Sequence, residues 1–508
     1  MKIYFNNGAM FGRPHSLLRK LTAICTCAVA FICTQSTLAQ ALGEWQEPPP
    51  VDGDYTWPLA AFTGALMPDG KILVWQTDGE TARLWDSSTG AFTCMPNFST
   101  PLFCSGHASL ANGSLLIAGG GYPSSGRKDT NVYCYGNCFL TFGGSPWQIK
   151  QDMNFARYYP TCTTLGDGSI LVSAGKDASE QHVTFPEIYD PVADSWSTMD
   201  FADKQIPLYP FMFLLPDGRV FFAGPRKNTF VLDIDTGFWD PNPIVAEYFA
   251  SKGTAAMYEP GKIIRIGGDT DGVTESAVEL IDFNEATPAW STASSMNQAR
   301  YDHQAVLLAD GKVLVIGGLA PGGAPLKLAE LYDPAANTWT NMEVMTFNRY
   351  HHAIALLLPD GKVLSAGGNN CNGEPSDDCD FGGFPSTYCN AELFAPPYLF
   401  AGPTPVIGFA PTTISYGLDF TVSLSTTSPV GSSGIAKVSL IRPGAMTHNF
   451  DQNQRYVELD FTLGGIGHQN SIFITAPLNG NIAPPGYYML FLISDDGVPA
   501  VAKFVQLQ

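Results

Sequence analysis

A phenol and an imidazole stand side by side at Tyr350 and His351, and both groups can bind a metal ion. They belong to the segment Asn348 to Gly361, in which an apolar run leads into a tight Pro-Asp-Gly turn. The apolar run predicts a strand, so the pair lies in a loop that feeds the end of a sheet, where polar side chains can converge. We interpret the pair as half of a metal site.

The same neighbourhood has a purely structural alternative. Arg157-Tyr158 and Arg300-Tyr301 occupy similar places elsewhere in the chain, so an Arg-Tyr pair can be a repeated packing feature. His351 sets its segment apart, because here two adjacent histidines follow the tyrosine. His303 is a weaker version of the same signal.

Cys104 and Tyr159 form a second candidate pair. Each stands eight residues before a turn, Asn112-Gly113 and Asp167-Gly168 respectively. If the two turns belong to neighbouring copies of one repeat, equal register places the thiol and the phenol next to each other. The alternative is that Cys104 is an ordinary buried cysteine of the core.

His448 is the third candidate. It lies in the polar segment Gly444 to Phe450, between two predicted strands near the end of the chain. Alone it would be a surface loop histidine. It completes the site only if its loop reaches the other candidates.

A repeat must position these residues. An apolar run, a turn and a second apolar run return seven times, at intervals of 43 to 55 residues. Asp-Gly and Asn-Gly supply the positive φ angles of two-residue hairpins, and further strand-like segments, often with a Trp, follow each hairpin. The turns are Asp69-Gly70, Asn112-Gly113, Asp167-Gly168, Asp217-Gly218, Pro260-Gly261, Asp310-Gly311 and Asp360-Gly361. Four strands in about 50 residues predict kelch-type blades, so the chain is all-β with a seven-bladed β-propeller.

The domain boundaries follow from where this repeat starts and stops. A basic, acid-free start and the apolar run from Leu21 to Cys33 predict a signal peptide over residues 1–41, too short a run for a membrane span. The propeller occupies 42–400, and the segment around Trp45 is expected to supply the outer strand of the seventh blade. Short alternating segments predict an immunoglobulin-like β-sandwich over 401–508.

Charge and cysteines narrow the function classes. The formal net charge is −20, and the predicted leader carries only positive charges, so the mature surface is acidic and nucleic acid is not expected as a partner. We expect a secreted protein, extracellular or periplasmic. In that compartment Cys134 with Cys138 and Cys371 with Cys379 are close enough in sequence for local disulfides.

Five motifs in order resemble the secreted copper radical oxidases, the galactose oxidase and glyoxal oxidase family, over nearly the whole mature length. They are Phe103-Cys104-Ser105-Gly106, Arg157-Tyr158-Tyr159-Pro160-Thr161, Arg349-Tyr350-His351, Thr447-His448-Asn449 and Ala483 to Phe491. The resemblance implies a thioether between Cys104 and Tyr159 and one copper ion held by Tyr159, Tyr350, His351 and His448. It also implies a protein-derived Cys-Tyr radical, with Tyr350 as the base for the substrate hydroxyl.

The chemistry of these side chains agrees with the copper site that the resemblance implies. Imidazoles and phenolates in a tetragonal arrangement suit Cu(II), and a bound metal lowers the pKa of a phenol. Oxidising an alcohol or aldehyde removes two electrons, of which one copper ion accepts one and a tyrosyl radical the other. Dioxygen then takes up both electrons and gives hydrogen peroxide.

The chain departs from galactose oxidase in two places that bear on substrate. The first blade is expected to start almost at the signal cleavage site, where galactose oxidase carries an additional carbohydrate-binding module. No Trp occurs between Trp147 and Trp196, where galactose oxidase stacks one over the cross-linked tyrosine. We therefore expect a monomeric oxidase that converts small, glyoxal-type aldehydes and O2 to acids and H2O2. The alternatives are a primary alcohol or galactose oxidase, and a non-catalytic kelch protein that binds glycans or proteins. His107 and His182 are candidates for supporting roles, with packing or surface exposure as the alternative.

Overall fold

The computed structural model describes residues 41–50, 57–76, 79–121, 125–136, 145–248, 250–368, 389–465 and 467–508. The predicted signal peptide lies outside these residues except for its last position. Cys138, Cys371 and Cys379 lie outside them too, whereas Cys389 is disulfide-bonded and Cys162 is a free thiol. None of the helices in the described ranges is both long and apolar enough to cross a membrane.

The predicted hairpins form as the turn chemistry requires. In one repeat β22 (Gln304–Leu307) pairs antiparallel with β23 (Val313–Ile316), and Gly311 between them has φ +89°. Both strands are fully buried, because their side chains on each face pack against a neighbouring blade. β24 (Leu328–Asp333) and β25 (Thr338–Val344) complete the sheet toward the outside.

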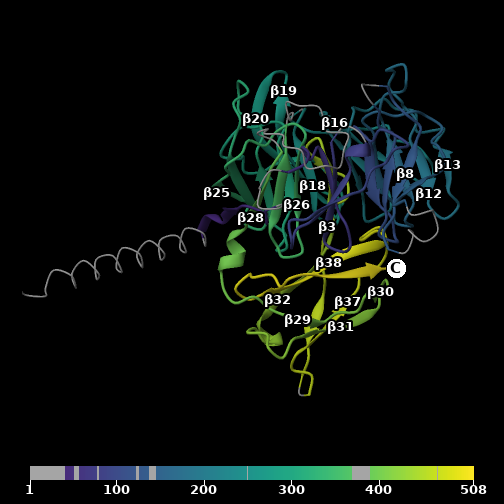
Figure 1. The fold of residues 1–508 in the computed structure, drawn as a ribbon. Coiled ribbons are helices and arrows are strands. Elements are labelled where there is room, and N and C mark those ends of the chain that lie inside the picture. The colour runs from purple at the N-terminus through teal and green to yellow at the C-terminus, as the bar shows by residue number, and fades with distance from the viewer. Residues whose placement is uncertain are drawn as a thin grey trace, which may run out of the picture.

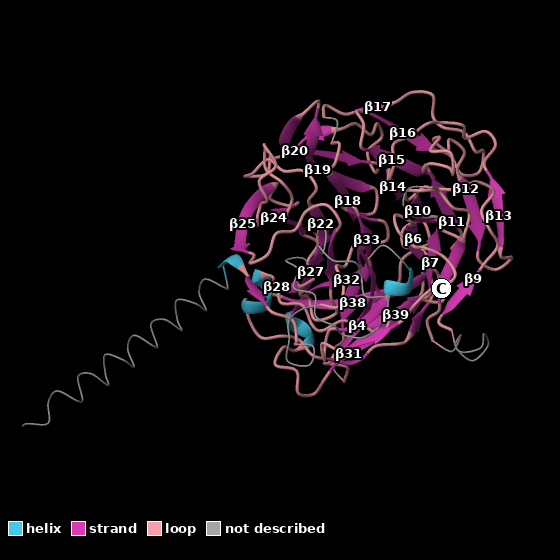
Figure 2. Cartoon of the chain, turned by 45° about the horizontal axis from the view of Figure 1, so that its top comes forward, coloured by secondary structure: helices cyan, strands magenta, loops and turns pink. Residues whose placement is uncertain are grey.

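Seven such sheets stand in a ring within the described part of the chain, as Figure 2 shows. This arrangement confirms the all-β fold and the seven-bladed kelch-type propeller. The strands of the other blades are β2 (Thr63–Leu66), β3 (Lys71–Trp75), β4 (Arg83–Asp86), β5 (Phe92–Cys94); β6 (Gly106–Ser109), β7 (Leu115–Ala118), β8 (Thr130–Tyr133), β9 (Trp147–Ile149); β10 (Thr161–Thr164), β11 (Ile170–Ser173), β12 (Glu187–Asp190), β13 (Ser195–Thr198); β14 (Phe211–Leu214), β15 (Val220–Gly224), β16 (Asn228–Leu232), β17 (Ile244–Val245); β18 (Thr254–Glu259), β19 (Lys262–Thr270), β20 (Val273–Asp282), β21 (Ser291–Thr292); and β26 (Ala353–Leu357), β27 (Val363–Gly367), β28 (Ala391–Ala395).

The propeller ring closes where a strand before the first blade joins the sheet of the seventh blade. The seventh sheet has the order β1-β28-β27-β26, in which β1 (Glu44–Gln46) is the outer strand. Trp45 pairs with Phe394, and the two rings lie 4.9 Å apart. The segment around Trp45 therefore supplies the missing strand, as predicted.

The C-terminal strands build a two-sheet sandwich below the propeller (Figure 1). One sheet has the order β29-β31-β37-β36 and the other β30-β39-β38-β32-β35, and buried aliphatic side chains from both sheets form one hydrophobic cluster between them. The bounds are β29 (Ile407–Phe409), β30 (Thr413–Ile414), β31 (Asp419–Leu424), β32 (Ile435–Arg442), β35 (Arg455–Glu458), β36 (Phe461–Leu463), β37 (Ser471–Thr475), β38 (Gly486–Ser494) and β39 (Lys503–Leu507).

One hairpin leaves this sandwich and joins the propeller. It consists of β33 (Ala445–Thr447) and β34 (Phe450–Asp451). β33 pairs antiparallel with β2, the innermost strand of the first blade, and widens that blade to a six-stranded sheet. The C-terminal domain therefore reaches the axis of the ring.

Candidate metal centre

Residues in one register line the centre of the ring. The residue eight positions before each turn is Ala61, Cys104, Tyr159, Tyr209, Lys252, Asp302 or His352. All of these except Ala61 have left-handed backbone, with φ from +44° to +65°. Such a conformation costs about 1–2 kcal/mol for a residue other than glycine, so the surrounding fold must impose it.

Backbone hydrogen bonds join these residues from blade to blade. The Tyr159 N–H donates to the Cys104 carbonyl at 2.9 Å, and the Tyr209 N–H donates to the Tyr159 carbonyl at 3.0 Å. On the other side of the ring the Asp302 N–H donates to the Lys252 carbonyl at 2.7 Å. Equal register thus does bring Cys104 and Tyr159 into adjacent positions, which is the geometry that the sequence predicts for them.

His448 enters from the inserted hairpin. It occupies the turn between β33 and β34, where it and Asn449 have φ +47° and +71°. The Thr447 hydroxyl lies 2.8 Å from His448 Nδ1 and also bonds to Thr63 of the first blade, at 3.2 Å. These contacts orient the His448 imidazole and leave its Nε2 facing the other axis residues.

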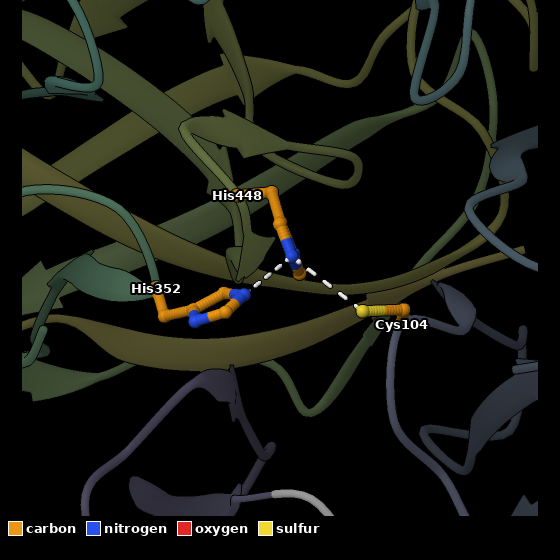
Figure 3. A group of neighbouring side chains, drawn as sticks. All are labelled: Cys104, His352 and His448. Atoms are coloured by element: carbon orange, nitrogen blue, oxygen red, sulfur yellow. Dashed lines mark hydrogen bonds between the residues drawn. The ribbon is translucent and has the colours of Figure 1, made fainter. Parts of the chain in front are cut away.

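Three side chains converge at this point, as Figure 3 shows. His448 Nε2 is 2.7 Å from His352 Nε2 and 3.5 Å from Cys104 Sγ. Their candidate ligand atoms all lie within 4.8 Å of one another. The three residues come from the seventh blade, the C-terminal domain and the second blade.

Burial keeps both imidazoles neutral. It lowers the pKa of His352 from its usual value of 6.5 to about 3, with the nearby His351 acting in the same direction. Burial likewise lowers the pKa of His448 well below its usual value. Neutral imidazole is the form that binds a metal, so both side chains are ready to do so at neutral pH.

The thiol lies among tyrosines. Cys104 is buried, its pKa is raised to about 12 by that burial, and it lies within hydrogen-bonding reach of the phenols of Tyr158 and Tyr159. The ring of Tyr159 meets Tyr158, Tyr209 and His448 edge to face, at centroid distances of 4.3, 5.1 and 5.2 Å. The Tyr209 hydroxyl donates to the Ser105 carbonyl at 3.0 Å. Two tyrosine rings and one imidazole ring therefore stand at steep angles to the ring of Tyr159.

The residues of the predicted Tyr350-His351 pair lie beside this cluster. The group of His and Cys ligands contains His352, whereas the sequence-based hypothesis gave that place to His351. The His351 ring lies 4.0 Å from the His352 ring and 5.1 Å from that of His448. Tyr350 is half-buried and its carbonyl accepts the Ala353 N–H at 2.8 Å, so its role as a ligand stays a prediction.

The other candidate histidines have different surroundings. His107 and His303 are fully buried, and their ring nitrogens have no hydrogen-bond partner among the described residues. His182 is exposed. Sequence reasoning missed His352, although a signal for it existed, because His352 stands eight residues before Asp360 as Cys104 stands eight before Asn112.

The donor set fits a copper ion. Two imidazole nitrogens that each lie about 2 Å from one metal ion, at about a right angle, are about 3 Å apart. The observed 2.7 Å between His352 Nε2 and His448 Nε2 agrees with that separation. Imidazole together with phenol and sulfur donors is a set that copper accepts.

A ring of kelch blades with imidazole, thiol and phenol groups at its axis defines a class of propeller metalloenzymes. Residues 404–507 match the profile of the galactose oxidase-like early set domain, and residues 301–345 match that of the kelch motif. An aldehyde oxidase GLOX of Vitis pseudoreticulata is 31% identical, over 80% of this chain and 82% of the relative. A galactose oxidase of Gibberella zeae is 28% identical, over 92% of this chain and 71% of the relative.

A solved structure extends the likeness to three dimensions. A fungal alcohol oxidase of the AA5 family, in complex with copper, superimposes with a TM-score of 0.76 at 26% identity. The match covers 92% of this chain and 100% of the other. The chain belongs to the galactose oxidase and glyoxal oxidase family of copper-dependent oxidases.

Proposed function

We propose that the protein is a copper radical oxidase that converts small aldehydes, as their hydrates, and O2 to carboxylic acids and H2O2. The observation that carries this proposal is the meeting of Cys104, His352 and His448 beside Tyr159 at the propeller axis. Two imidazoles are poised to bind copper, and the thiol lies next to the phenol that would carry the radical. The relatives named aldehyde oxidase and galactose oxidase support the same class.

The first chemical event is formation of the thioether. A bond forms between Cys104 Sγ and a ring carbon of Tyr159, and the S–H and C–H bonds break. The two protons and two electrons that leave reduce one O2 to H2O2. The resulting sulfur substituent makes the Tyr159 radical easier to form and to hold.

Copper, when bound, would supply a one-electron acceptor. The oxidised Tyr159 would take the second electron as part of the hydrogen atom that leaves the substrate carbon. Half-buried His352 and His448, both neutral, would hold their nitrogens in place for the ion. The family resemblance assigns to Tyr350 the proton of the substrate hydroxyl. Reoxidation by O2 restores the site and releases H2O2.

The substrate proposal rests on the surroundings of Tyr159. A hexose needs a broad aromatic face, and galactose oxidase provides it with a Trp that this chain lacks between Trp147 and Trp196. Tyr158 and Tyr209 present their rings at 75° and 87° to Tyr159, which narrows the space beside it. A small aldehyde hydrate needs no such platform.

The cellular setting is part of the proposal. The basic, acid-free start and the apolar run before residue 41 support secretion, to the periplasm or the outside. We propose a monomer that acts on a small molecule with O2.

A peroxide assay on the copper-loaded protein tests the proposal. We expect kcat/KM for glyoxal or methylglyoxal to exceed that for galactose by at least about tenfold, equal to about 1.4 kcal/mol in transition-state binding. His448→Ala should lose bound copper and turnover, while His468→Ala, at an exposed histidine of the sandwich, should keep both. A preference for galactose would refute the aldehyde specificity. No peroxide from any aldehyde or alcohol would favour the non-catalytic binding protein.

A further inference from the structure

His351 stands where a third imidazole could reach the ion held by His352 and His448. The His351 ring is tilted 40° to the His352 ring, and their centroids are 4.0 Å apart. It is nearly perpendicular to the His448 ring, at 83°, with the centroids 5.1 Å apart. His352 is also nearly perpendicular to His448, at 87° and 4.3 Å. Three imidazole rings thus lie near one another, although the ligand atoms that lie within 4.8 Å of one another belong to His352, His448 and Cys104 and not to His351.

A carboxylate faces one edge of the His351 ring. Asp302 Oδ1 lies 3.8 Å from His351 Nδ1, and Asp302 is 6% exposed. Asp302 is one of the left-handed axis residues, and its Oδ1 also accepts a hydrogen bond from Asn449 Nδ2 at 3.1 Å. Asn449 follows His448 directly, so one short segment holds both His448 and the carboxylate that faces His351.

The Asp302 carboxylate favours one tautomer of His351, although their separation of 3.8 Å is longer than a hydrogen bond. An imidazole that directs its Nδ1–H toward a carboxylate keeps the lone pair on Nε2, which is the arrangement commonly found for metal-binding histidines. The His351 side chain is 39% exposed, whereas Cys104 is buried, so His351 lies on the solvent side of Cys104.

We infer that His351, oriented by Asp302, joins His352 and His448 as the third imidazole ligand of the copper ion, and that Tyr350, which the family resemblance makes a ligand, does not bind the ion. The inference rests on the proposed function for the presence of copper. Asp302 acts through His351 and is a positioning residue. The site then has three imidazoles and one cross-linked phenol, in place of two imidazoles and two phenols.

Electron paramagnetic resonance of the Cu(II)-loaded protein, with nitrogen couplings resolved, tests the inference. We expect three coupled imidazole nitrogens in the unchanged protein and two in His351→Phe. Copper affinity, measured by competition with a chelator, should fall at least about tenfold in His351→Phe. Asp302→Asn should keep three nitrogens but weaken copper binding by about 10- to 100-fold.

Three further variants make the result decisive. His468→Ala should match the unchanged protein in both measurements. Tyr350→Phe should keep the nitrogen count and the affinity. His351→Gln is measured beside His351→Phe, so that a folding defect in one variant does not decide the matter.

The outcomes separate the two proposals. If His351→Phe and His351→Gln keep the spectrum and affinity of the unchanged protein, the inference is wrong while the copper site stands. The same holds if Tyr350→Phe removes a tyrosinate-to-copper absorption band and His351→Phe does not. If the unchanged protein binds no copper, or binds it equally after His352→Ala and His448→Ala, the proposed function itself fails.

Discussion

Cys104 and Tyr159 meet because two blades hold them in the same register, and their backbones are joined by a 2.9 Å hydrogen bond. We predict that copper and oxygen join the two side chains covalently. Intact mass should then fall by two hydrogens, and peptide mapping should show one linked pair. The thiol is buried and its pKa is raised to about 12, so spontaneous thiolate chemistry does not compete.

The matched comparison is Cys162, a fully buried free thiol in the third blade. Cys162→Ser should leave the mass change intact, whereas Cys104→Ser should abolish it. A free Cys104 thiol after exposure to copper and air would contradict the prediction.

His107 makes the fold sensitive to acid. Burial lowers its pKa from 6.5 to about 3, and its ring packs edge-on against Trp75 at 5.2 Å. The unfolded chain therefore takes up a proton at higher pH than the folded protein does, so the free energy of unfolding falls as pH drops from 6.5 toward 3.

We predict that His107→Phe, which keeps a ring against Trp75, loses less stability than the unchanged protein between pH 7 and pH 4. The difference should approach 1.4 kcal/mol per pH unit at most. The measurement is the thermal midpoint as a function of pH. Parallel curves for the two proteins would show that His107 does not titrate on unfolding.

The sequence predicted some of the contacts at the axis and not others. Counting eight residues back from a turn paired Cys104 with Tyr159, and the structure has them adjacent. The same count gives His352 in the seventh blade. The sequence-based hypothesis placed the metal ligands at the neighbouring Tyr350 and His351, because a tyrosine beside a histidine matches the family pattern, and that assignment stays a prediction.

The roles of Asp302 and Asn449 could not be predicted in this way. Their contact joins the sixth blade to the C-terminal hairpin, across 147 residues. This contact depends on the register of β33 against β2. The two strands are not copies of one sequence repeat, so the spacing of the repeats does not predict that register.

At the scale of the strands, a buried ion pair recurs between the start of a blade and its third strand. Arg157 pairs with Glu187 at 2.8 Å, and Arg300 with Glu330 at 2.5 Å, with all four side chains fully buried. Each glutamate also accepts backbone N–H groups, such as that of Asn297 at 2.6 Å. The repeated Arg of the Arg-Tyr pairs is therefore a packing feature, as the structural alternative held.

We predict that Glu330→Gln costs about 3–5 kcal/mol of stability, because it leaves the Arg300 guanidinium buried without its counter-charge. Glu259→Gln is the control, since its pair with Lys262 is partly exposed and should contribute less than about 1 kcal/mol. Thermal unfolding of both variants at pH 7 decides the matter. Equal losses would mean that backbone contacts alone hold the Arg300 segment.

At the scale of the whole molecule, tryptophans of the outer strands tie neighbouring blades together. The Trp196 indole N–H donates to the Gln151 carbonyl and that of Trp339 to the Ser294 carbonyl, at 2.8 and 2.7 Å. Trp45 follows the same rule, since its N–H donates to the Glu343 carbonyl at 2.8 Å. The closing strand thus carries the same connection as the strands inside the array.

We predict that Trp45→Ala lowers the thermal midpoint more than Trp196→Ala does. Trp45 belongs to a three-residue strand at the start of the chain, while Trp196 is held by a hairpin within its own blade. Hydrogen exchange should accelerate in β28 after Trp45→Ala and stay local to the third blade after Trp196→Ala. The same midpoint for both variants would argue that ring closure adds nothing to stability.

The architecture was open to prediction because its signals are local and repeated. Turns such as Asp310-Gly311 fix the hairpins, and their spacing fixes the number of blades. The strand contributed by Trp45 followed from a blade that lacked one. The insertion of β33 beside β2 could not be foreseen, since β33 has three residues and no turn signal of its own.

The pairing of β33 with β2 also means that the axis cluster can assemble only late in folding. Cys104 and His448 are 344 positions apart, and they meet only after the first blade has received its strand from the last domain. During synthesis, most of the polypeptide has emerged before His448 exists. An incomplete or damaged chain therefore lacks one of the two closely spaced imidazole nitrogens at the axis. If the proposed copper site is correct, a redox-active ion is retained only by molecules in which the C-terminal hairpin has joined the first blade.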